Sequence, residues 1–336
     1  MIVTLFKKIP AAIVIVPLFV GMLIHLIMET SMSEMAFANY NDIIVNISNV
    51  LLMLLVFGIC SQLNFKKVGS SLKRGAVLLS LKFFVAAVLA ILVVVFAGPA
   101  GFLGISALAI VAAISNPNTA LFAGIAKQYG EDEDAPAIMI LSLGNGPFFS
   151  LLILSASGLL SVDFLTMLIP LLPMILGIMV GNLIPRAQPY LLKMTIIILP
   201  IFALILGTTI SVITALRGGA QGLLLGFVTL VLTGILAYFI SGVYMGKGKR
   251  SPMAAGAGTT AGNAIMVPAF IAGLSGTSDE IIAASNQAVA QVAGSMIFTA
   301  IFAPLVVSMV FKYEQRRREK LGIERIVTFE ENNRTK

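Results

Sequence analysis

The sequence has little of what soluble enzymes use for chemistry. It has one cysteine, Cys60, one histidine, His25, and no tryptophan among 336 residues, and charged residues make up only 11% of the chain. One cysteine excludes a disulfide framework, and one histidine excludes a histidine-rich metal site. The sequence contains no phosphate-binding loop and no Ser/His/Asp or Cys/His arrangement. We therefore expect no enzymatic activity, no cofactor and no metal.

The composition is that of a membrane protein. Hydrophobic residues make up 58% of the chain and the mean hydropathy is +1.02, whereas soluble domains are about 45–50% apolar. The net charge of +7 does not indicate nucleic-acid binding, because the basic residues lie in short loops and a tail between apolar segments. This distribution is the signal that orients a membrane protein.

Apolar segments of about 20 residues, long enough to cross a hydrocarbon core, can be placed ten times. They lie near 9–28, 43–63, 75–97, 102–126, 136–160, 164–184, 194–215, 220–244, 252–274 and 281–311. With a cytoplasmic N-terminus, every basic residue except Arg217 and Lys82 falls in cytoplasmic loops or the tail. This asymmetry predicts ten spans with both termini in the cytoplasm. Residues 1–311 then form the transmembrane domain, and residues 312–336 form a basic tail that touches anionic lipid or only enforces orientation.

Two of these segments contain polar interruptions. Ser115-Asn116-Pro117-Asn118-Thr119 lies in the fourth, and Gly258-Thr259-Thr260-Ala261-Gly262-Asn263 lies in the ninth. A helix broken at this depth must pair its freed backbone groups with protein, a solvated cavity or a ligand. Paired interruptions in two halves are typical of transporter binding sites. The alternative is a kink at Pro117 whose polar neighbours bond to adjacent helices.

We therefore predict an all-α polytopic membrane protein with ten transmembrane helices. Five spans in each half give the halves opposite topology, so the predicted architecture is a 5+5 inverted repeat of residues 8–160 and 164–311. Its helices 4 and 9 are broken and cross at mid-membrane.

The interruptions and the spans that follow them supply the candidate substrate-binding residues. In the interruptions these are Asn116, Asn118, Thr119, Thr259, Thr260 and Asn263, and in the following spans they are Ser142, Asn145, Asn286, Gln287 and Gln291. Neutral amides and hydroxyls suit a ligand with many hydroxyl groups, or a Na⁺ ion, and the N-termini of broken helices favour a carboxylate. Helix packing is the alternative for each amide singly.

Lys82 is the one charged residue expected well inside a span. A lysine at that depth normally pairs with a partner or faces a cavity, so we expect it to compensate the charge of an anionic substrate. The alternative is that its long side chain extends to the cytoplasmic interface.

No carboxylate is expected in mid-membrane, because all 15 fall in loops, span ends or the tail. His25 and Glu29, near the outer end of the first span, are the nearest titratable candidates for ion coupling, unless they only face water. Ser115, Asn116 and Thr260 are the candidates for direct ion binding.

Several motifs, in order over residues 8–307, carry a family resemblance. They are Ile9-Pro10, Val16-Pro17, Leu72-Lys73-Arg74-Gly75, Lys82-Phe83, Ser106-Ala107-Leu108-Ala109-Ile110, Ser115-Asn116 through Asn118, Gln128-Tyr129-Gly130, Ile140-Leu141-Ser142-Leu143, Gly146-Pro147-Phe148-Phe149 and Thr260-Ala261-Gly262-Asn263-Ala264. Together they resemble the 2-keto-3-deoxygluconate permease family. The resemblance implies a bacterial inner-membrane symporter that imports this sugar acid with a cation. It also implies the ten-span fold of bile-acid sodium symporters, in which broken helices 4 and 9 cross.

Two positions depart from what the resemblance implies. Asn145 stands where family members carry an acidic residue, and only Thr259, Thr260 and Asn263 are found where bile-acid symporters place a glutamate. The chain therefore resembles a divergent paralogue, and the coupling ion stays open between H⁺ and Na⁺. The alternatives are a Na⁺-coupled transporter of another small organic anion, a passive channel or a membrane sensor.

Overall fold

The computed structural model describes residues 12–61, 72–97, 101–131, 134–144, 146–156, 171–209, 212–246, 248–273 and 279–328. Every element assigned in these ranges is a helix, which confirms the prediction of an all-α protein. The elements are α2 (Ala12–Ser31), α3 (Glu34–Cys60), α4 (Leu72–Ala97), α5 (Ala107–Ser115), α6 (Thr119–Tyr129), α7 (Asp134–Leu141), η2 (Ser142–Gly144), α8 (Pro147–Ala156), α10 (Leu171–Leu183), η3 (Pro185–Ala187), α11 (Gln188–Gly207), α12 (Val212–Thr229), η4 (Leu230–Ile235), α13 (Leu236–Ile240), α14 (Gly242–Met245), η5 (Pro252–Ala257), η6 (Gly262–Ile265), α15 (Met266–Ala272) and α16 (Asp279–Lys320).

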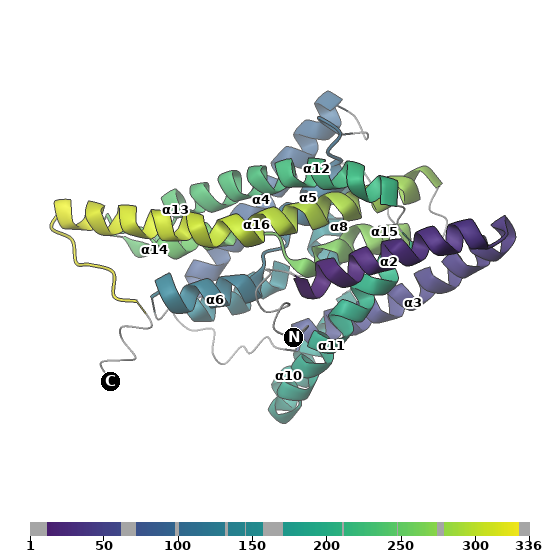
Figure 1. Ribbon diagram of the computed structural model, residues 1–336. Coiled ribbons are helices and arrows are strands. Elements are labelled where there is room, and N and C mark those ends of the chain that lie inside the picture. Colours follow the sequence, from purple (N-terminus) through teal and green to yellow (C-terminus); the bar gives the residue numbers. More distant parts are fainter. Residues whose placement is uncertain are drawn as a thin grey trace, which may run out of the picture.

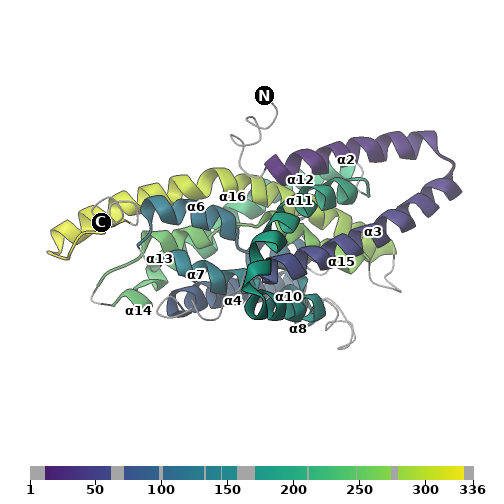
Figure 2. The ribbon, with the colours of Figure 1, turned by 90° about the horizontal axis from the view of Figure 1, so that it is seen from below.

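The helices form two groups (Figures 1 and 2). In one group α11 packs against α2 and α3, and α3 packs against α10. In the other, α16 packs against α12, α15 and α5, while α4 packs against α5 and α7. The long helix α16 extends along one side of the second group, and the α2–α3 hairpin projects from the first. The groups meet where α15 contacts α3 and where α12 contacts α2.

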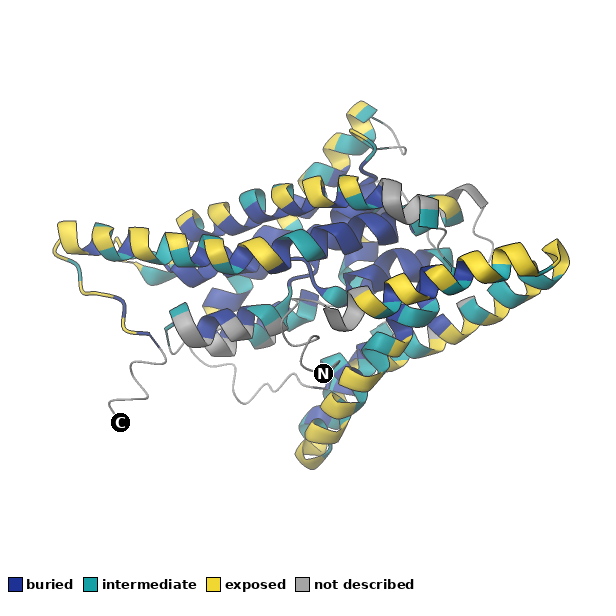
Figure 3. Ribbon diagram, viewed as in Figure 1, coloured by how far each residue is buried: buried dark blue, intermediate teal, exposed yellow. Residues whose placement is uncertain are grey.

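Five helices in the described ranges are long and apolar enough to span a membrane. They are Glu34–Cys60, Lys73–Ala97, Pro185–Gly207, Gly218–Met245 and Ile282–Lys320, and three shorter apolar helices cover Val16–Ser31, Pro147–Ala156 and Leu171–Leu183. Many large apolar side chains are exposed, among them Phe84 (68% exposed) and Phe96 (81% exposed). Exposed residues lie along the outer faces of the helices (Figure 3). Such a surface suits lipid rather than water. The protein is therefore a membrane protein, while the ten-span inverted repeat stays a prediction.

Both sequence interruptions coincide with breaks in helices. Three residues separate α5 from α6, and residues 258–261 separate η5 from η6, which leads into α15. No continuous helix therefore spans residues 102–126 or 252–274, although both stretches are apolar enough to form one.

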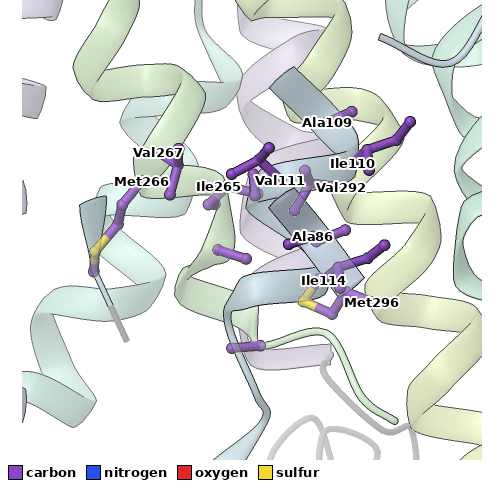
Figure 4. Close-up of a cluster of buried hydrophobic side chains, with 14 of the residues drawn as sticks. Ala86, Ala109, Ile110, Val111, Ile114, Ile265, Met266, Val267, Val292 and Met296 are labelled. Atoms are coloured by element: carbon purple, nitrogen blue, oxygen red, sulfur yellow. The ribbon is translucent and has the colours of Figure 1, made fainter. Parts of the chain in front are cut away.

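The hydrophobic core surrounds these breaks (Figure 4). Its central residues are Ala86 of α4, Ala109, Ile110, Val111 and Ile114 of α5, Ile265 of η6, Met266 and Val267 of α15, and Val292 and Met296 of α16. Small alanine side chains let the short helices approach α4 and α16 closely. The polar breaks are thus enclosed by apolar packing, where an unpaired backbone group is costly.

The predicted boundary between the transmembrane domain and the tail, at residue 311, falls inside a helix. α16 continues without interruption to Lys320, and Glu314 and Arg318 within this continuation are 0% and 1% exposed. The first part of the predicted tail therefore packs with the transmembrane helices, and residues 329–336 lie outside the described ranges.

Glycine allows the closest contact between α12 and α16. Gly222 and Gly294 face each other, and a Cβ atom at residue 222 would meet the carbonyl oxygen of Gln291. A Cβ atom at Gly219, one turn earlier, would meet nothing within 4 Å. Close helix packing through small residues is a common means of association in membranes.

We predict that Gly222→Ala destabilises the fold by about 1–3 kcal/mol, because the added methyl group forces α12 away from the backbone of α16. Gly219→Ala is the matched control and should leave the thermal unfolding temperature unchanged or slightly higher. The unfolding temperature of each detergent-purified variant is measured by heating samples and monitoring the remaining folded protein by size-exclusion chromatography. Equal unfolding temperatures for the two variants would contradict the close contact.

Candidate functional site

The first helix break is shaped by a proline and an asparagine. α5 ends at Ser115, and Pro117 cannot donate the backbone hydrogen bond that a continuing helix requires. α6 begins at Thr119, and the Asn118 side chain caps it by accepting a 3.0 Å hydrogen bond from the amide of Leu121. Asparagine is among the preferred N-cap residues, so the sequence itself restarts the helix here.

The side chain of Asn116 fixes this break against α8. Its Nδ2 donates to the carbonyl of Ala112 at 3.0 Å and to Ser150 Oγ at 3.1 Å, and its Oδ1 accepts from the amide of Gly146 at 3.0 Å. A further 3.0 Å bond runs from Nδ2 to Ser115 Oγ. Because both ends of the amide are bonded within the protein, Asn116 holds the break in shape.

The two breaks lie against each other and are joined by hydrogen bonds. The bonds run from Ala261 N to Asn116 O (3.0 Å), from Thr260 Oγ1 to Ala113 O (3.1 Å) and from Asn118 N to Thr259 Oγ1 (3.0 Å). We call residues 113–118 and 257–263 the crossing. Each break thus supplies partners for backbone groups that the other has freed, as the apolar interior requires.

Each predicted half of the chain has a similar side-chain contact at its break. Ser115 Oγ lies 2.8 Å from Ser150 Oγ, and Thr260 Oγ1 lies 2.7 Å from Ser295 Oγ; both pairs are separated by 35 residues along the chain. In the second half Thr299 adds a bond, because its Oγ1 accepts from the amide of Thr260 at 3.0 Å. The sequence interpretation missed Ser150, Ser295 and Thr299, although each hydroxyl stands in a locally apolar stretch of its helix.

Lys82 lies at the crossing. It is 0% exposed, and its Nζ donates to the carbonyls of Ala257 at 2.9 Å and Thr259 at 3.0 Å. These carbonyls flank the point where η5 ends, and the carbonyl of Ala257 also accepts a 2.8 Å hydrogen bond from the amide of Thr259. The ammonium group therefore satisfies backbone acceptors of the second break and does not extend to the interface.

A cavity of about 530 Å³ lies between the two helix groups, at the start of α16. Its described lining residues come from α3 (Ala38, Asn41, Asp42, Asn46 and Ser48), from the end of α11 and beyond (Leu206 and Thr209), from α15 (Ala269 and Ala272) and from α16 (Ile282 and Asn286). Ala269 is six residues past Asn263, so the cavity wall approaches the crossing to within about two helical turns. Its volume is in the range that holds small ligands.

An ion-pair network occupies the other end of α16. Arg74 Nη1 donates to Asp134 Oδ1 at 2.8 Å, and Arg74 Nη2 donates to Glu131 Oε2 at 2.9 Å. The side chain of Glu131 also lies 3.7 Å from Arg318 Nη1, and Arg318 Nε donates to Glu314 Oε1 at 3.1 Å. We call these five residues the ion-pair network. Burial raises the pKa of the Asp134 carboxyl, and the charge of Arg74 opposes this rise.

The network joins the two predicted halves of the chain. Arg74, Glu131 and Asp134 belong to the first half, whereas Glu314 and Arg318 follow the second. Tyr238 and Arg250 extend it, since the tyrosine hydroxyl donates to Glu314 Oε2 at 2.6 Å and the amide of Arg250 donates to Glu314 Oε1 at 3.2 Å. Asn286 and Arg318 are 32 residues apart on α16, so the cavity and the network are separated by about 48 Å along the helix.

Comparisons with known proteins identify the family of the chain. The family model for 2-keto-3-deoxygluconate permease matches residues 3–316. The chain is 32% identical over 308 residues to a 2-keto-3-deoxygluconate permease of Xanthomonas euvesicatoria pv. vesicatoria, covering 90% of this chain and 95% of the relative. It is 30% identical over 311 residues to 2-keto-3-deoxygluconate permease 1 of Salmonella typhimurium, covering 93% and 96%. The chain belongs to the 2-keto-3-deoxygluconate permease family. This membership confirms the resemblance and the prediction of a transporter rather than an enzyme.

The crossing of this family member brings together about half of the predicted site residues. They are Lys82, Ser115, Asn116, Asn118, Thr259, Thr260 and Asn263, and Thr119 is the first residue of the adjoining α6. The Nδ2 atom of Asn263 is buried without a hydrogen-bond partner in the described part of the chain. Asn263 is therefore the crossing residue with an unused donor for a ligand.

The other predicted residues lie elsewhere. Gln291 donates to Gln221 Oε1 and to the carbonyl of Gly104, both at 2.6 Å, and Gln287 donates to Gln221 Oε1 at 3.2 Å. Ser142 Oγ, at the start of η2, donates to the carbonyl of Ile138 in the preceding helix α7.

The two titratable candidates and Asn286 are also away from the crossing. His25 Nδ1 lies 2.8 Å from the carbonyl of Thr208, and His25 Nε2 lies 3.7 Å from Glu29 Oε2. Asn286 lines the cavity, and Asn145 lies outside the described residues.

We predict that Arg74→Met destabilises the protein by about 3–5 kcal/mol, because it leaves the buried carboxylate of Asp134 without its ionic partner. The neighbouring Lys73 is exposed, so Lys73→Met should change the stability by less than about 0.5 kcal/mol. Thermal unfolding of both variants in detergent tests the difference. If Arg74→Met unfolded at the same temperature as Lys73→Met, the network would have no structural role.

Proposed function

We propose that this protein is a secondary active transporter that imports 2-keto-3-deoxygluconate, or a similar sugar acid, across the bacterial inner membrane by symport with H⁺ or Na⁺. The observation that carries the proposal is the crossing, in which two broken helices bond to each other inside an apolar core. Broken helices at this position are the usual means by which secondary transporters expose backbone dipoles to a substrate. The relatives are named 2-keto-3-deoxygluconate permeases, which supports this substrate.

The proposed topology has ten spans in a 5+5 inverted repeat, with both termini in the cytoplasm. It is supported by the matched contacts Ser115–Ser150 and Thr260–Ser295, which repeat the same separation of 35 residues in each half. In the proposed orientation, the end of the molecule that holds Arg74 and Arg318 faces the cytoplasm, and the excess of lysine and arginine at that end supports this orientation. The cavity then opens toward the outside.

In this orientation the structure corresponds to an outward-open state. The cavity near Asn286 gives the substrate access from outside, while the ion-pair network joins the two halves on the cytoplasmic side. Alternating access would require the cavity to close and the Glu131–Arg318 contact to separate. Separating Glu131 from Arg318 would cost less electrostatic energy than separating Arg74 from Asp134, because the Glu131–Arg318 distance is already 3.7 Å.

We propose that the substrate reaches the crossing from the cavity. The unused Nδ2 donor of Asn263 would bind a substrate oxygen, and the N-terminus of α6 beyond Asn118 would favour the substrate carboxylate. Lys82 would contribute positive charge beside the second break, where its Nζ donates to the carbonyls of Ala257 and Thr259.

Uptake of labelled 2-keto-3-deoxygluconate into proteoliposomes tests the proposal. We predict accumulation above the external concentration when an inward gradient of either H⁺ or Na⁺ is imposed, and the gradient that works identifies the coupling ion. Absence of uptake under both gradients, with protein shown to be folded, would contradict the proposed substrate.

Asn263→Ala in the same assay tests the site. Removing an unsatisfied buried donor should leave the thermal stability unchanged or higher, while transport should fall by about tenfold or more because a substrate hydrogen bond is lost. Asn39→Ala is the matched control, since Asn39 is exposed on α3 and outside the cavity lining. Transport by Asn263→Ala at the rate of the control would exclude Asn263 from the site.

A further inference from the structure

The cavity between α3 and α16 has a polar wall made largely by one helix. Asn41, Asp42, Asn46 and Ser48 of α3 line it, and Asn286 of α16 lines it as well. The four α3 residues are spread over two helical turns of a segment that is otherwise apolar toward Cys60. A polar stripe on a membrane helix faces protein, water or a ligand rather than lipid.

Two polar atoms in this wall lack partners. Asn41 Oδ1 and Ser48 Oγ are buried and make no hydrogen bond within the described part of the chain. The whole Ser48 residue is only 6% exposed. Buried polar groups are nearly always bonded, so the wall has an unmet capacity to accept and donate hydrogen bonds. Hydroxyl groups of a ligand in the cavity would meet it, because each hydroxyl both donates and accepts.

Asp42 gives the cavity a negative charge. Asp42 is an exposed residue and carries the only charged side chain among the described residues that line the cavity. Its carboxylate has no ion pair or hydrogen bond in the described part of the chain. Asn46 Nδ2 donates instead to the backbone carbonyl of Asp42, at 2.9 Å. The carboxylate is therefore available to a ligand of opposite charge.

No other charged group of the neighbouring helices offsets Asp42. The titratable and charged residues on these helices are His25 and Glu29 of α2, Glu34, Tyr40 and Cys60 of α3, Tyr190 and Lys193 of α11, and Asp279, Glu280 and the residues from Lys312 onward on α16, and α15 has none. Asp279 and Glu280 are acidic, so they cannot offset Asp42. Of the others, none lines the cavity among the residues whose side chains are described. Lys82, the buried cation nearest the crossing, donates to two backbone carbonyls.

An anionic sugar acid in this cavity would therefore be repelled by Asp42 unless a cation entered with it. We infer that the cavity is a joint binding site for one polyhydroxylated anion and one monovalent cation, in which Asp42 binds the cation and Asn41, Ser48 and Asn286 bind ligand hydroxyls. This inference rests on the proposed function and identifies the residue that makes transport depend on the ion. The sequence interpretation excluded such a residue, because Asp42 was assigned to the end of a span.

A joint site would couple the binding of the anion to the binding of the cation through thermodynamic linkage. If the cation removes the repulsion between Asp42 and the anion, it raises the affinity for the anion, and by reciprocity the anion raises the affinity for the cation. An anion alone binds weakly, so the transporter moves the two together. A coupling of this kind typically changes affinity by about 5- to 150-fold.

Binding of labelled 2-keto-3-deoxygluconate to the purified full-length protein tests the inference. The affinity is measured in acidic and alkaline buffer without Na⁺, and in alkaline buffer with Na⁺ or with N-methylglucamine. For the wild type we expect an increase of about 5- to 150-fold with H⁺ or with Na⁺, and the two arms distinguish the cation. Asp42→Asn should bind the anion with an affinity that is the same in all four buffers.

Two further variants separate the roles of the wall. Glu34→Gln removes a carboxylate of the same helix outside the cavity and should behave as the wild type. Ser48→Ala should lower the affinity for the anion in every buffer but keep its cation dependence, because it removes only a hydroxyl partner. A Ser48→Ala variant with wild-type affinity would exclude Ser48 from the site.

The outcomes also separate this inference from the proposed function. No binding by the folded wild type in any buffer would contradict the substrate, and hence the proposed function. Binding that is equally cation-dependent in the wild type and in Asp42→Asn would overturn the inference alone. If Asp42→Asn failed to fold, a wild-type affinity that is identical in all four buffers would still overturn it.

Discussion

The structure depends on the pairing of backbone groups that two broken helices leave free in an apolar interior. Water cannot reach these groups, so each must find a partner within the protein. The crossing meets this requirement by reciprocal bonds, in which Asn116 O accepts from the second break and Thr259 Oγ1 accepts at the first. Lys82 completes the arrangement by donating to two carbonyls where η5 ends. A buried cation that holds backbone carbonyls is thus a structural part of the crossing as well as a source of charge.

This arrangement limits how the molecule can change shape. The crossing is closely bonded, whereas the helices around it meet through fewer polar contacts, so rearrangement is expected at the two ends of α16. At one end lies a cavity with unpaired polar atoms at Asn41 and Ser48. At the other, the link between the halves depends on Glu131, whose contact with Arg318 is the longest in the ion-pair network. Opening at one end and closing at the other would leave the crossing intact.

The sequence predicts the helix breaks well, because proline, paired asparagines and threonines are unusual inside apolar segments and directly affect backbone pairing. It predicts the depth of Lys82 but not its partners, since carbonyls of a distant break leave no mark on composition. Gln287 and Gln291 were expected in the site, yet they pack with Gln221, as amides between membrane helices often do. Asp42 was passed over because its position near a span end suggests solvent, and only the packing of α3 against α15 shows that it lines a cavity. The sequence did contain a signal, because polar residues recur along this helix at Asn41, Asp42, Asn46 and Ser48.

The measurement that tests the account most directly is the distance change at both ends of α16 in a membrane. Spin labels at Lys73 and Lys320, in a Cys60→Ser background, report on the network end, and labels at Met35 and Ala283 report on the cavity end; all four residues are exposed. The distance between each pair of labels would be measured by double electron–electron resonance in lipid nanodiscs. The distances with 2-keto-3-deoxygluconate and the coupling ion would be compared with the distances without them. The account predicts that the network-end distance grows while the cavity-end distance shrinks. Distances that stay constant at both ends, or that change in the same direction, would contradict alternating access around a fixed crossing.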